Sequence, residues 1–352
     1  MVSVLLFLWV INPTQFDTSK VPEVDILEVS PDMAQFLDVH VVPVRNPVLR
    51  LQRLVQVVFN ESFLSLSYEN TETKTSVETF RDRSGNCLSF TNMFVAMARY
   101  CGFTAHFQEV ENVPTWDRHG NVVVLNRHMN ALIFIVGKKI TVDFNPYNRP
   151  EDRRTMVVSD ARALAQYYNN IGAELFGDGQ RELALAHFQR ALQIEDRISF
   201  TWSNLGVAYQ YVDDAEMAER CYLKALKVSR AELTAMNNLE RLYRRQGRLE
   251  EANKYHRRVV RFRKRNPFYH YELGRAALER ANYDKAVGHF RAAIRRKPKT
   301  HEFHWMLAAA YHGMGDADKA AKALVRAREY APNVFDKDRY SQKLELMASS
   351  KK

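Results

Sequence analysis

The feature that most constrains this chain is a spacing of 34 residues that recurs through its second half. The same kind of residue returns at each step, and one column is alanine in all five units. A small residue at a fixed point lets two helices cross closely, and a large residue four positions later fills the neighbouring groove. The period therefore predicts five helical hairpins stacked as a solenoid over residues 165–334. The clearest columns are Ile171, Leu205, Leu239, Leu273 and Leu307; Ala184, Ala218, Ala252, Ala286 and Ala320; Phe188, Tyr222, Phe290 and Leu324; and Gly172, Gly206 and Gly274.

This spacing and these columns resemble the tetratricopeptide repeat. The resemblance implies an all-α solenoid that binds a protein or peptide partner. The segment 335–352 follows the fifth unit, and we expect a capping helix and tail there, because an end repeat must present a polar outer face.

Residues 31–146 lack this period and are predicted to form a separate domain. The stretch 47–60 has apolar residues at helical spacing, and a second apolar helix begins near Cys87. Four stretches rich in β-branched or aromatic residues follow, and several alternate with period two, which predicts an antiparallel sheet. The predicted fold class of this half is therefore α+β. The predicted strands are 104–111, 121–126, 128–136 and 138–145.

Between the two halves, residues 147–164 are predicted to be a linker. Two prolines and a cluster of charges lie within residues 146–161, a composition typical of a connection. Ser159 or Asp160 is suited to cap the first repeat helix.

Cys87 stands at the first turn of its predicted helix, in the stretch SGNCLSF. Unpaired backbone N–H groups and the positive end of the helix dipole favour a thiolate at that position. The alternative is that Cys87 is a small apolar residue on the buried face that also carries Phe90, Phe94 and Met97. With three cysteines the chain has no disulfide framework, and Cys101 lies about 21 Å farther along the same helix.

A histidine and an aspartate follow on neighbouring predicted strands. His128 opens one apolar strand and Asp143 lies in the next. Apolar strands seldom carry a charge inward unless it is paired. In a hairpin the two residues become cross-strand neighbours, so that Asp143 would orient the imidazole and His128 would accept the proton of Cys87. The alternative for each is a satisfied polar residue at the end of a strand.

A cysteine on a helix, then a histidine strand, then an aspartate strand resembles the order in the transglutaminase-like cysteine enzymes, whose fold is papain-like. The resemblance covers roughly residues 45–146, through GNCLSFTNMFVAMARYCGFTA, HMNALI and ITVDFNP. It implies that Cys87 is the nucleophile, that His128 is the general base and acid, and that Asp143 orients the imidazole.

Two positions depart from the family pattern. Asn130 stands where the family commonly has an aromatic residue, and Phe144 and Asn145 separate Asp143 from the following proline. With period-two alternation, Asn130 faces the same side as His128, and Asn145 the same side as Asp143. The two amides are able to bind polar groups of a substrate or to satisfy each other, and the sequence leaves both alternatives open.

We therefore predict cysteine-dependent acyl transfer or hydrolysis of a peptide or protein amide through a thioester. The backbone N–H of Cys87 is the predicted oxyanion donor, and Gln108 is a candidate for a second one. The alternative is a non-enzymatic repeat scaffold with an inactive transglutaminase-like domain. The sequence holds none of the motifs CxxC, HExxH or GxxxxGK[ST], so we expect neither a metal nor a cofactor.

The positive charge of the chain is concentrated in one part of the repeats. Residues 241–300 hold nineteen Lys or Arg and five Asp or Glu, in a chain of formal net charge +10. A solvated helix face is one explanation, and a concave repeat surface that holds an acidic peptide or an anionic surface is the other. Nucleic acid is disfavoured because no recognised nucleic-acid-binding fold accompanies the charge. The residues predicted to contact a partner are Arg257, Arg258, Arg261, Arg263, Lys264 and Arg265.

Residues 1–30 are predicted to be the remnant of an export signal or an N-terminal extension. Val2 to Ile11 are apolar except for Ser3, which matches the core of a signal peptide in length and is too short to span a bilayer. An export signal would place the protein in the cell envelope or periplasm, and otherwise we expect it in the cytoplasm. Membrane contact is expected only through this N-terminus, if it is not cleaved.

Overall fold

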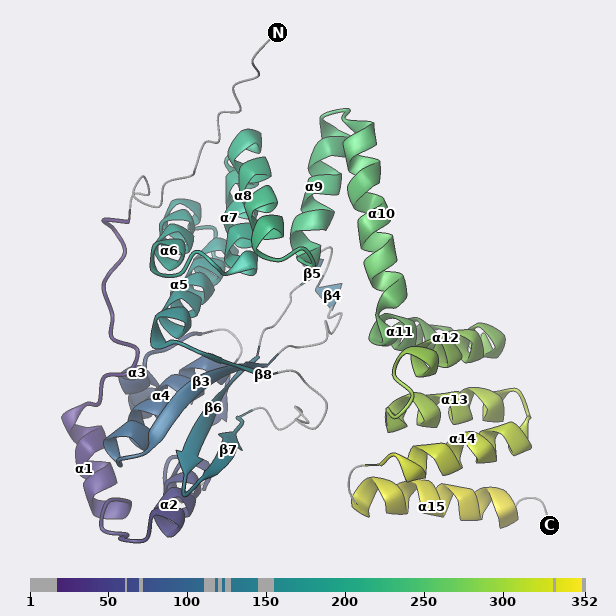
Figure 1. Cartoon of the computed structure of the whole chain (residues 1–352), viewed down its shortest axis with the longest axis horizontal. Helices are drawn as coiled ribbons and strands as arrows, with labels where there is room; N and C mark the ends of the chain where they lie inside the picture. The colour runs from purple at the N-terminus through teal and green to yellow at the C-terminus, as the bar shows by residue number, and fades with distance from the viewer. Residues whose placement is uncertain are drawn as a thin grey trace. The chain divides into compact units, whose positions relative to one another are not determined.

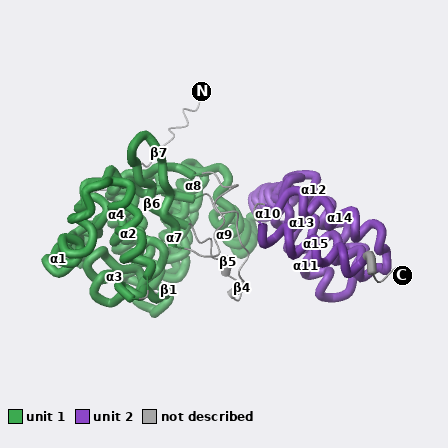
Figure 2. The backbone as a smooth tube through the Cα atoms, turned by 90° about the horizontal axis from the view of Figure 1, so that it is seen from below, with its two compact units in different colours: residues 1–112, 116–248 green, residues 113–115, 249–352 purple. Residues whose placement is uncertain are grey.

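The computed structural model describes residues 18–60, 62–69, 72–110, 118–119, 122–123, 128–144, 155–331 and 334–349. The predicted export-signal remnant or N-terminal extension, residues 1–30, is described only from residue 18 onward, so the apolar run Val2 to Ile11 lies outside these ranges. The chain divides into two compact units, one ending at Arg248 and one beginning at Leu249 (Figure 2). Each unit is described by itself below.

Four helices precede and support the sheet of the first unit (Figure 1). Three of them begin at a polar side chain that accepts hydrogen bonds from the first turn, Ser30, Asn46 and Asn86, and Thr75 starts the remaining one with a capping box. The last helix is buried on every side from Leu88 to Ala98, and its three buried polar residues, Ser89, Thr91 and Asn92, each form a hydrogen bond. The helices are α1 (Pro31–His40), α2 (Pro47–Phe59), α3 (Ser76–Asp82) and α4 (Cys87–Tyr100).

The main sheet is antiparallel and has four strands in the order β7-β6-β3-β8. A two-residue turn joins β6 to β7, and both of its residues, Val136 and Gly137, have positive φ, as a type I′ hairpin turn requires. The predicted α+β fold class is thus confirmed. The strands are β3 (Thr104–Val110), β6 (His128–Ile135), β7 (Lys138–Val142) and β8 (Thr155–Val158); β1 (Ser67–Tyr68) pairs in parallel with β2 (Ser84–Gly85), and β4 (Arg118–His119) pairs with β5 (Val122–Val123).

The structure differs from the sequence-based expectation in two of these segments. The predicted linker 147–164 contributes β8, which pairs with β3, and then the start of the first repeat helix at Asp160. Residues 155–158 form a strand because three of the four are β-branched and β3 offers them an unpaired edge. The predicted strand 121–126 is described only at its two residues in β5.

Ten helices at the predicted period follow, and Ser159 is the N-cap of the first of them. At the close crossing, a Cβ on Gly172 would lie 2.8 Å from the ring of Phe188, and one on Gly274 2.6 Å from the ring of Phe290. Only a glycine fits there, which is the packing that the columns predicted. The helices are α5 (Asp160–Gly177), α6 (Arg181–Ile194), α7 (Ser199–Tyr211), α8 (Ala215–Val228), α9 (Leu233–Arg245), α10 (Leu249–Arg265), α11 (Pro267–Glu279), α12 (Tyr283–Arg296), α13 (His301–Gly313) and α14 (Ala317–Glu329).

The third repeat departs from these columns. It carries Glu240 where other repeats have glycine or alanine, and His256 where they have a large apolar residue. The division between the two compact units falls inside this repeat, between α9 and α10.

The turn within each repeat places one residue in the left-handed region of φ, again every 34 residues. Glycine occupies three of these positions, whereas the second and fourth repeats have residues with a side chain. The five positions are Gly179, Asp213, Gly247, Ala281 and Gly315, with φ of 81°, 58°, 73°, 54° and 78°.

The first repeat shares the hydrophobic core of the α+β half of the chain. Ala163 and Tyr168 of α5 lie in the same buried cluster as Phe94 of α4 and Phe107 of β3. A buried Glu109 on β3 pairs with the guanidinium group of Arg162 at 2.7 Å. The junction between the two halves is therefore a packed interface.

The last helix, α15 (Val334–Ser349), closes the repeat series. Its exposed side chains include the apolar Val334, Phe335 and Leu346, each at least 60% exposed, so its outer face is less polar than we expected. Within the described ranges, no helix has the length and apolar character needed to cross a membrane.

Candidate active site

The first turn of α4 places a thiol at the surface of an otherwise buried helix. The side chain of Asn86 caps the helix by accepting from the backbone N–H groups of Leu88 (3.0 Å) and Ser89 (3.1 Å). A Cβ on Gly85 would lie 2.6 Å from the Cβ of Ser89, so only glycine allows β2 to approach this turn. Because Asn86 does the capping, Cys87 is free to occupy the first helical position, where its side chain is half-exposed.

The hairpin brings His128 and Asp143 together. Ala131 pairs with Val142, so Asp143 lies just past β7 and diagonal to His128. Nε2 of His128 lies 2.6 Å from Oδ1 of Asp143. The Cys87 side chain lies near enough to the His128 ring to influence its charge. The structure thus places all three predicted catalytic residues close together.

The charge state of His128 follows from its surroundings. The side chain is 4% exposed, and burial alone lowers its pKa. Hydrogen bonds with Asp143 and Cys87, together with the negative charges of both, outweigh burial and raise the pKa of His128 to about 9. The arrangement can therefore hold an imidazolium beside a sulfur nucleophile at neutral pH.

Two further side chains fix the elements that carry these groups. The hydroxyl of Thr91 donates to the carbonyl oxygen of Cys87 (2.7 Å) and lies 3.2 Å from that of Met129, which ties α4 to β6 next to His128. Phe144 directly follows Asp143, and its ring centroid lies 5.0 Å from that of Phe59. It also lies 5.6 Å from Phe90 and 5.7 Å from Phe94. Phe144, one of the two departures from the family pattern, thus anchors Asp143 against α2 and α4.

The predicted substrate-binding amides take different places. Asn130 is 1% exposed and donates through Nδ2 to Oδ2 of Asp143 at 3.2 Å, so it supports the aspartate. Its Oδ1 must then point away from the carboxylate, and it has no donor among the described residues. Gln108 is its cross-strand partner, and Oε1 of Gln108 also lacks a donor there. Asn145 lies outside the described residues.

Tyr68 is a site residue that sequence reasoning missed. It lies on the short strand β1 and interacts with both the backbone N–H and the side chain of Cys87. Burial, followed by the negative charge of Cys87, raises the pKa of Tyr68 to about 12, so the phenol keeps its proton. A two-residue strand nineteen positions before the cysteine leaves no periodic signal, and only the pairing of β1 with β2 reveals the contact.

The family comparisons agree with both halves of the chain. A model of the transglutaminase-like superfamily matches residues 39–138. Models of the tetratricopeptide repeat match residues 164–194, 197–265 and 271–334. The chain joins a transglutaminase-like domain to tetratricopeptide repeats. The transglutaminase-like match includes Cys87 and His128 and ends before Asp143.

Individual relatives resemble parts of the chain. Superkiller protein 3 of Schizosaccharomyces pombe (strain 972 / ATCC 24843) is 26% identical over 180 residues, which are 48% of this chain and 13% of that protein. The chain thus matches only a small part of that relative's length.

Solved structures resemble the chain more weakly. MamA 41-end from Desulfovibrio magneticus RS-1 is 20% identical, with 49% of this chain and 96% of that one covered and a TM-score of 0.28. YrrB, whose title describes a TPR protein with an unusual peptide-binding site, is 18% identical, with 51% and 92% covered and a TM-score of 0.27. Likenesses of this size carry no argument about what this chain binds.

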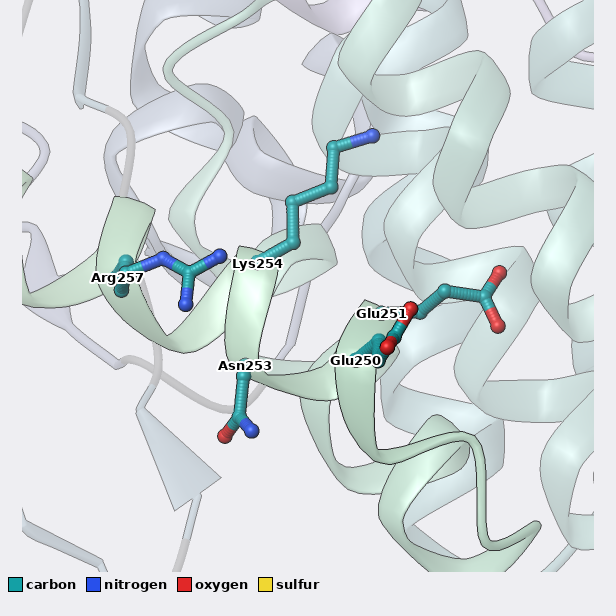
Figure 3. A pocket seen from close by; sticks show the side chains of 5 residues that line it. All are labelled: Glu250, Glu251, Asn253, Lys254 and Arg257. Atoms are coloured by element: carbon teal, nitrogen blue, oxygen red, sulfur yellow. The ribbon is translucent and has the colours of Figure 1, made fainter.

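The predicted partner-binding residues of the tetratricopeptide repeats all lie on α10. Arg257, Arg261, Lys264 and Arg265 are exposed, whereas Arg258 and Arg263 are half-buried. A shallow depression on this helix has a mixed lining of two carboxylates, two cations and an amide (Figure 3). The unbalanced positive charge therefore lies in the second half of α10. The depression is lined by Glu250, Glu251, Asn253, Lys254 and Arg257.

No group of three or more His, Cys, Asp or Glu side chains suited to a metal ion occurs among the residues whose placement is described.

Proposed function

We propose that the protein is a cysteine-dependent acyl-transfer enzyme that acts on an amide of a peptide or protein, and that its repeats hold a protein partner. The single observation that carries the proposal is the contact of His128 with Asp143 next to the Cys87 thiol. Asn130 supports the aspartate, so these four side chains are organised around one proton transfer.

The first half of the reaction forms a thioester. His128 takes the proton of Cys87, and Sγ attacks the amide carbon, forming a C–S bond and a tetrahedral oxyanion. Collapse of this intermediate breaks the C–N bond, and His128 gives the proton to the departing amine. Asp143 holds Nε2 of the ring, which leaves the other ring nitrogen for the sulfur.

The second half regenerates the enzyme. Water or an amine loses a proton to His128 and attacks the thioester, and the C–S bond breaks as the thiolate leaves. Water gives hydrolysis, and an amine gives a new amide. The same side chains serve both outcomes.

Tyr68 and the backbone N–H of Cys87 are suited to stabilise the oxyanion together. The phenol lies near this N–H, and its raised pKa keeps the O–H available as a donor. Tyr68 therefore takes the role of second donor that the sequence suggested for Gln108.

The second half of α10 is the surface that we assign to a partner. Residues 258–265 contain five Lys or Arg and no acid, which suits an acidic peptide segment. Arg261→Glu combined with Lys264→Glu, both exposed residues of this surface, is expected to abolish a salt-dependent interaction with a polyglutamate peptide. A polyglutamate interaction that survives this double substitution would contradict the assignment.

The experiment that tests the enzyme is site-resolved alkylation by iodoacetamide as a function of pH, for the wild type and His128→Ala. Cys101 and Cys221 serve as internal controls, because burial raises the pKa of both thiols. We expect Cys87 to react well below pH 8 and to lose this reactivity in His128→Ala. A Cys87 that reacts like the two controls, with no effect of His128, would favour the non-enzymatic scaffold instead.

A further inference from the structure

The first repeat carries a carboxyl group in a column that is otherwise apolar. Glu174 on α5 stands one turn before the end of the helix, and the residues at 34-residue intervals after it are all aliphatic. Three of these are buried in their own repeats. A carboxylate at this position has no role in the helix crossing. The four counterparts are Ala208, Leu242, Ala276 and Ala310.

The carboxyl group of Glu174 reaches the residue that caps the nucleophile helix. The hydroxyl of Thr73 donates to Oε1 of Glu174 at 2.7 Å. Nδ2 of Asn86 donates to the same hydroxyl oxygen, also at 2.7 Å. Thr73 is 5% exposed and Asn86 is 9% exposed, so the chain of hydrogen bonds is shielded from water.

This chain fixes the orientation of the cap. With Nδ2 bound to Thr73, Asn86 must turn Oδ1 toward the backbone N–H groups of Leu88 and Ser89. The neighbouring residue, Lys74, is tied to the same turn, because its N–H donates to the hydroxyl of Ser89 at 2.8 Å. The segment before α3 thus lies between the first repeat and the start of α4.

The charge on Glu174 responds to pH near neutrality. Burial raises the pKa of Glu174 to about 7, against the opposing hydrogen bonds from Thr73. Repulsion from Glu72 and from Asp178 acts in the same direction as burial, and Tyr167 on the same helix also senses the charge. Lys74, which follows Thr73 in the chain, is held by Glu72 at 3.2 Å and by Asp82 at 3.3 Å.

We propose that Glu174 is a positioning residue for Cys87, acting through Thr73 and Asn86, so that the first repeat helps to set the reactivity of the nucleophile. The inference rests on the proposed role of Cys87. The hydrogen bonds hold the cap in place, and the negative charge on Glu174 disfavours a second negative charge on the sulfur. Removing the charge on Glu174 should therefore raise the reactivity of Cys87, whereas breaking the hydrogen bonds through Thr73 should lower it.

The test measures the rate of Cys87 alkylation from pH 5.5 to pH 9. Glu174→Gln keeps an acceptor for Thr73 and removes the charge, so we expect the profile to move to lower pH by roughly 0.3–0.5 unit and to lose its step near pH 7. Thr73→Val and Glu174→Leu break the chain, and we expect the rate to fall about fivefold, as for a lost helix cap. Thr73→Ser should restore the wild-type rate.

Glu182→Gln removes an exposed carboxylate of the same repeat and should leave the profile unchanged. If Thr73→Val and Glu174→Leu lower only the unfolding temperature and Glu174→Gln leaves the profile at that of the wild type, Glu174 is merely structural and the proposal is overturned. That result would leave the proposed role of Cys87 intact, because this role is tested by His128→Ala. If His128→Ala leaves the alkylation of Cys87 at the wild-type rate, both the role of Cys87 and the role of Glu174 are contradicted.

Discussion

Helix α5 of the first repeat and helix α11 of the fourth occupy the same place in the 34-residue unit, yet their surroundings differ. Both use glycine for the close crossing, Gly172 against Phe188 and Gly274 against Phe290. Seven residues of α5 are buried, whereas in α11 only Gly274 is. The repeat columns therefore specify how two helices of one hairpin cross. They do not constrain the other faces of the hairpin, which can contact another part of the molecule.

Glu174 is such a contact between the first repeat and another part of the molecule. Its counterpart in α11 is Ala276, which is half-buried and has no polar group in its side chain. In α5 the same position lies against the segment before α3, and the side chain there is a carboxylate bound to Thr73. A departure from a repeat column therefore marks the place where the repeat supports another part of the molecule.

The largest expected effect separates chemistry from partner binding. His128→Ala should lower the burst of p-nitrophenolate from p-nitrophenyl acetate by about 10²–10⁴-fold, because the general base is lost. Arg261→Glu on α10 should leave the burst unchanged, since it alters only the exposed basic face. A burst that persists in Cys87→Ala would show that the released product comes from another group.

The next effect tests whether the two crossings stabilise different units. Gly172→Ala and Gly274→Ala should each destabilise their own repeat by about 1–3 kcal/mol, because a Cβ would overlap an aromatic ring held in the core. We expect region-resolved hydrogen exchange to rise in the transglutaminase-like domain only for Gly172→Ala, since that domain shares its core with α5. Equal exchange in that domain for both variants would contradict the inference that only the first repeat supports it.

The repeats could be predicted from the sequence because each contact recurs at a fixed interval. The glycine and aromatic columns identified the crossings, and the absence of both at Glu240 and His256 coincides with the division between the compact units. The left-handed turn position went unrecognised, because Asp213 and Ala281 interrupt its column of glycines.

The candidate site could be predicted only in part. Cys87, His128 and Asp143 stand out because a polar group in an apolar element requires a partner. Tyr68 and β8 could not be found in this way, since each is defined by pairing with a distant segment. Asn130 was correctly placed beside the triad, but its partner is Asp143 rather than a second amide among the described residues.

A smaller effect follows from the pKa of Glu174. Because the pKa in the folded protein, about 7, lies above the ordinary value of 4.5, folding is favoured by this group below pH 4.5 and loses that contribution as the pH rises through 7. Glu174→Gln should therefore match the wild type near pH 4.5 and gain about 1–2 kcal/mol at pH 8, after allowance for the half-exposed carboxyl group. Urea unfolding at the two pH values measures this difference, and Glu182→Gln provides the control. A loss of stability at pH 8 would show that the charge itself is needed.

The smallest effect compares the turns of the same two repeats. Ala281 adopts a φ of 54° and Gly179 a φ of 81°, and a side chain costs about 1–2 kcal/mol in this region. Glycine gains more entropy on unfolding, which offsets about 0.5–1 kcal/mol of that cost. Ala281→Gly should therefore stabilise the fourth repeat, and Gly179→Ala should destabilise the first, each by up to about 1 kcal/mol. No atom lies within 4 Å of a Cβ on Gly179, so Gly179→Ala is expected to act through backbone strain and not through a steric overlap.

Hydrogen exchange of α11 and α12 measures the effect of Ala281→Gly, with Ala281→Ser as a control that keeps the same strain. Faster exchange in Ala281→Gly would mean that chain entropy outweighs strain at this turn.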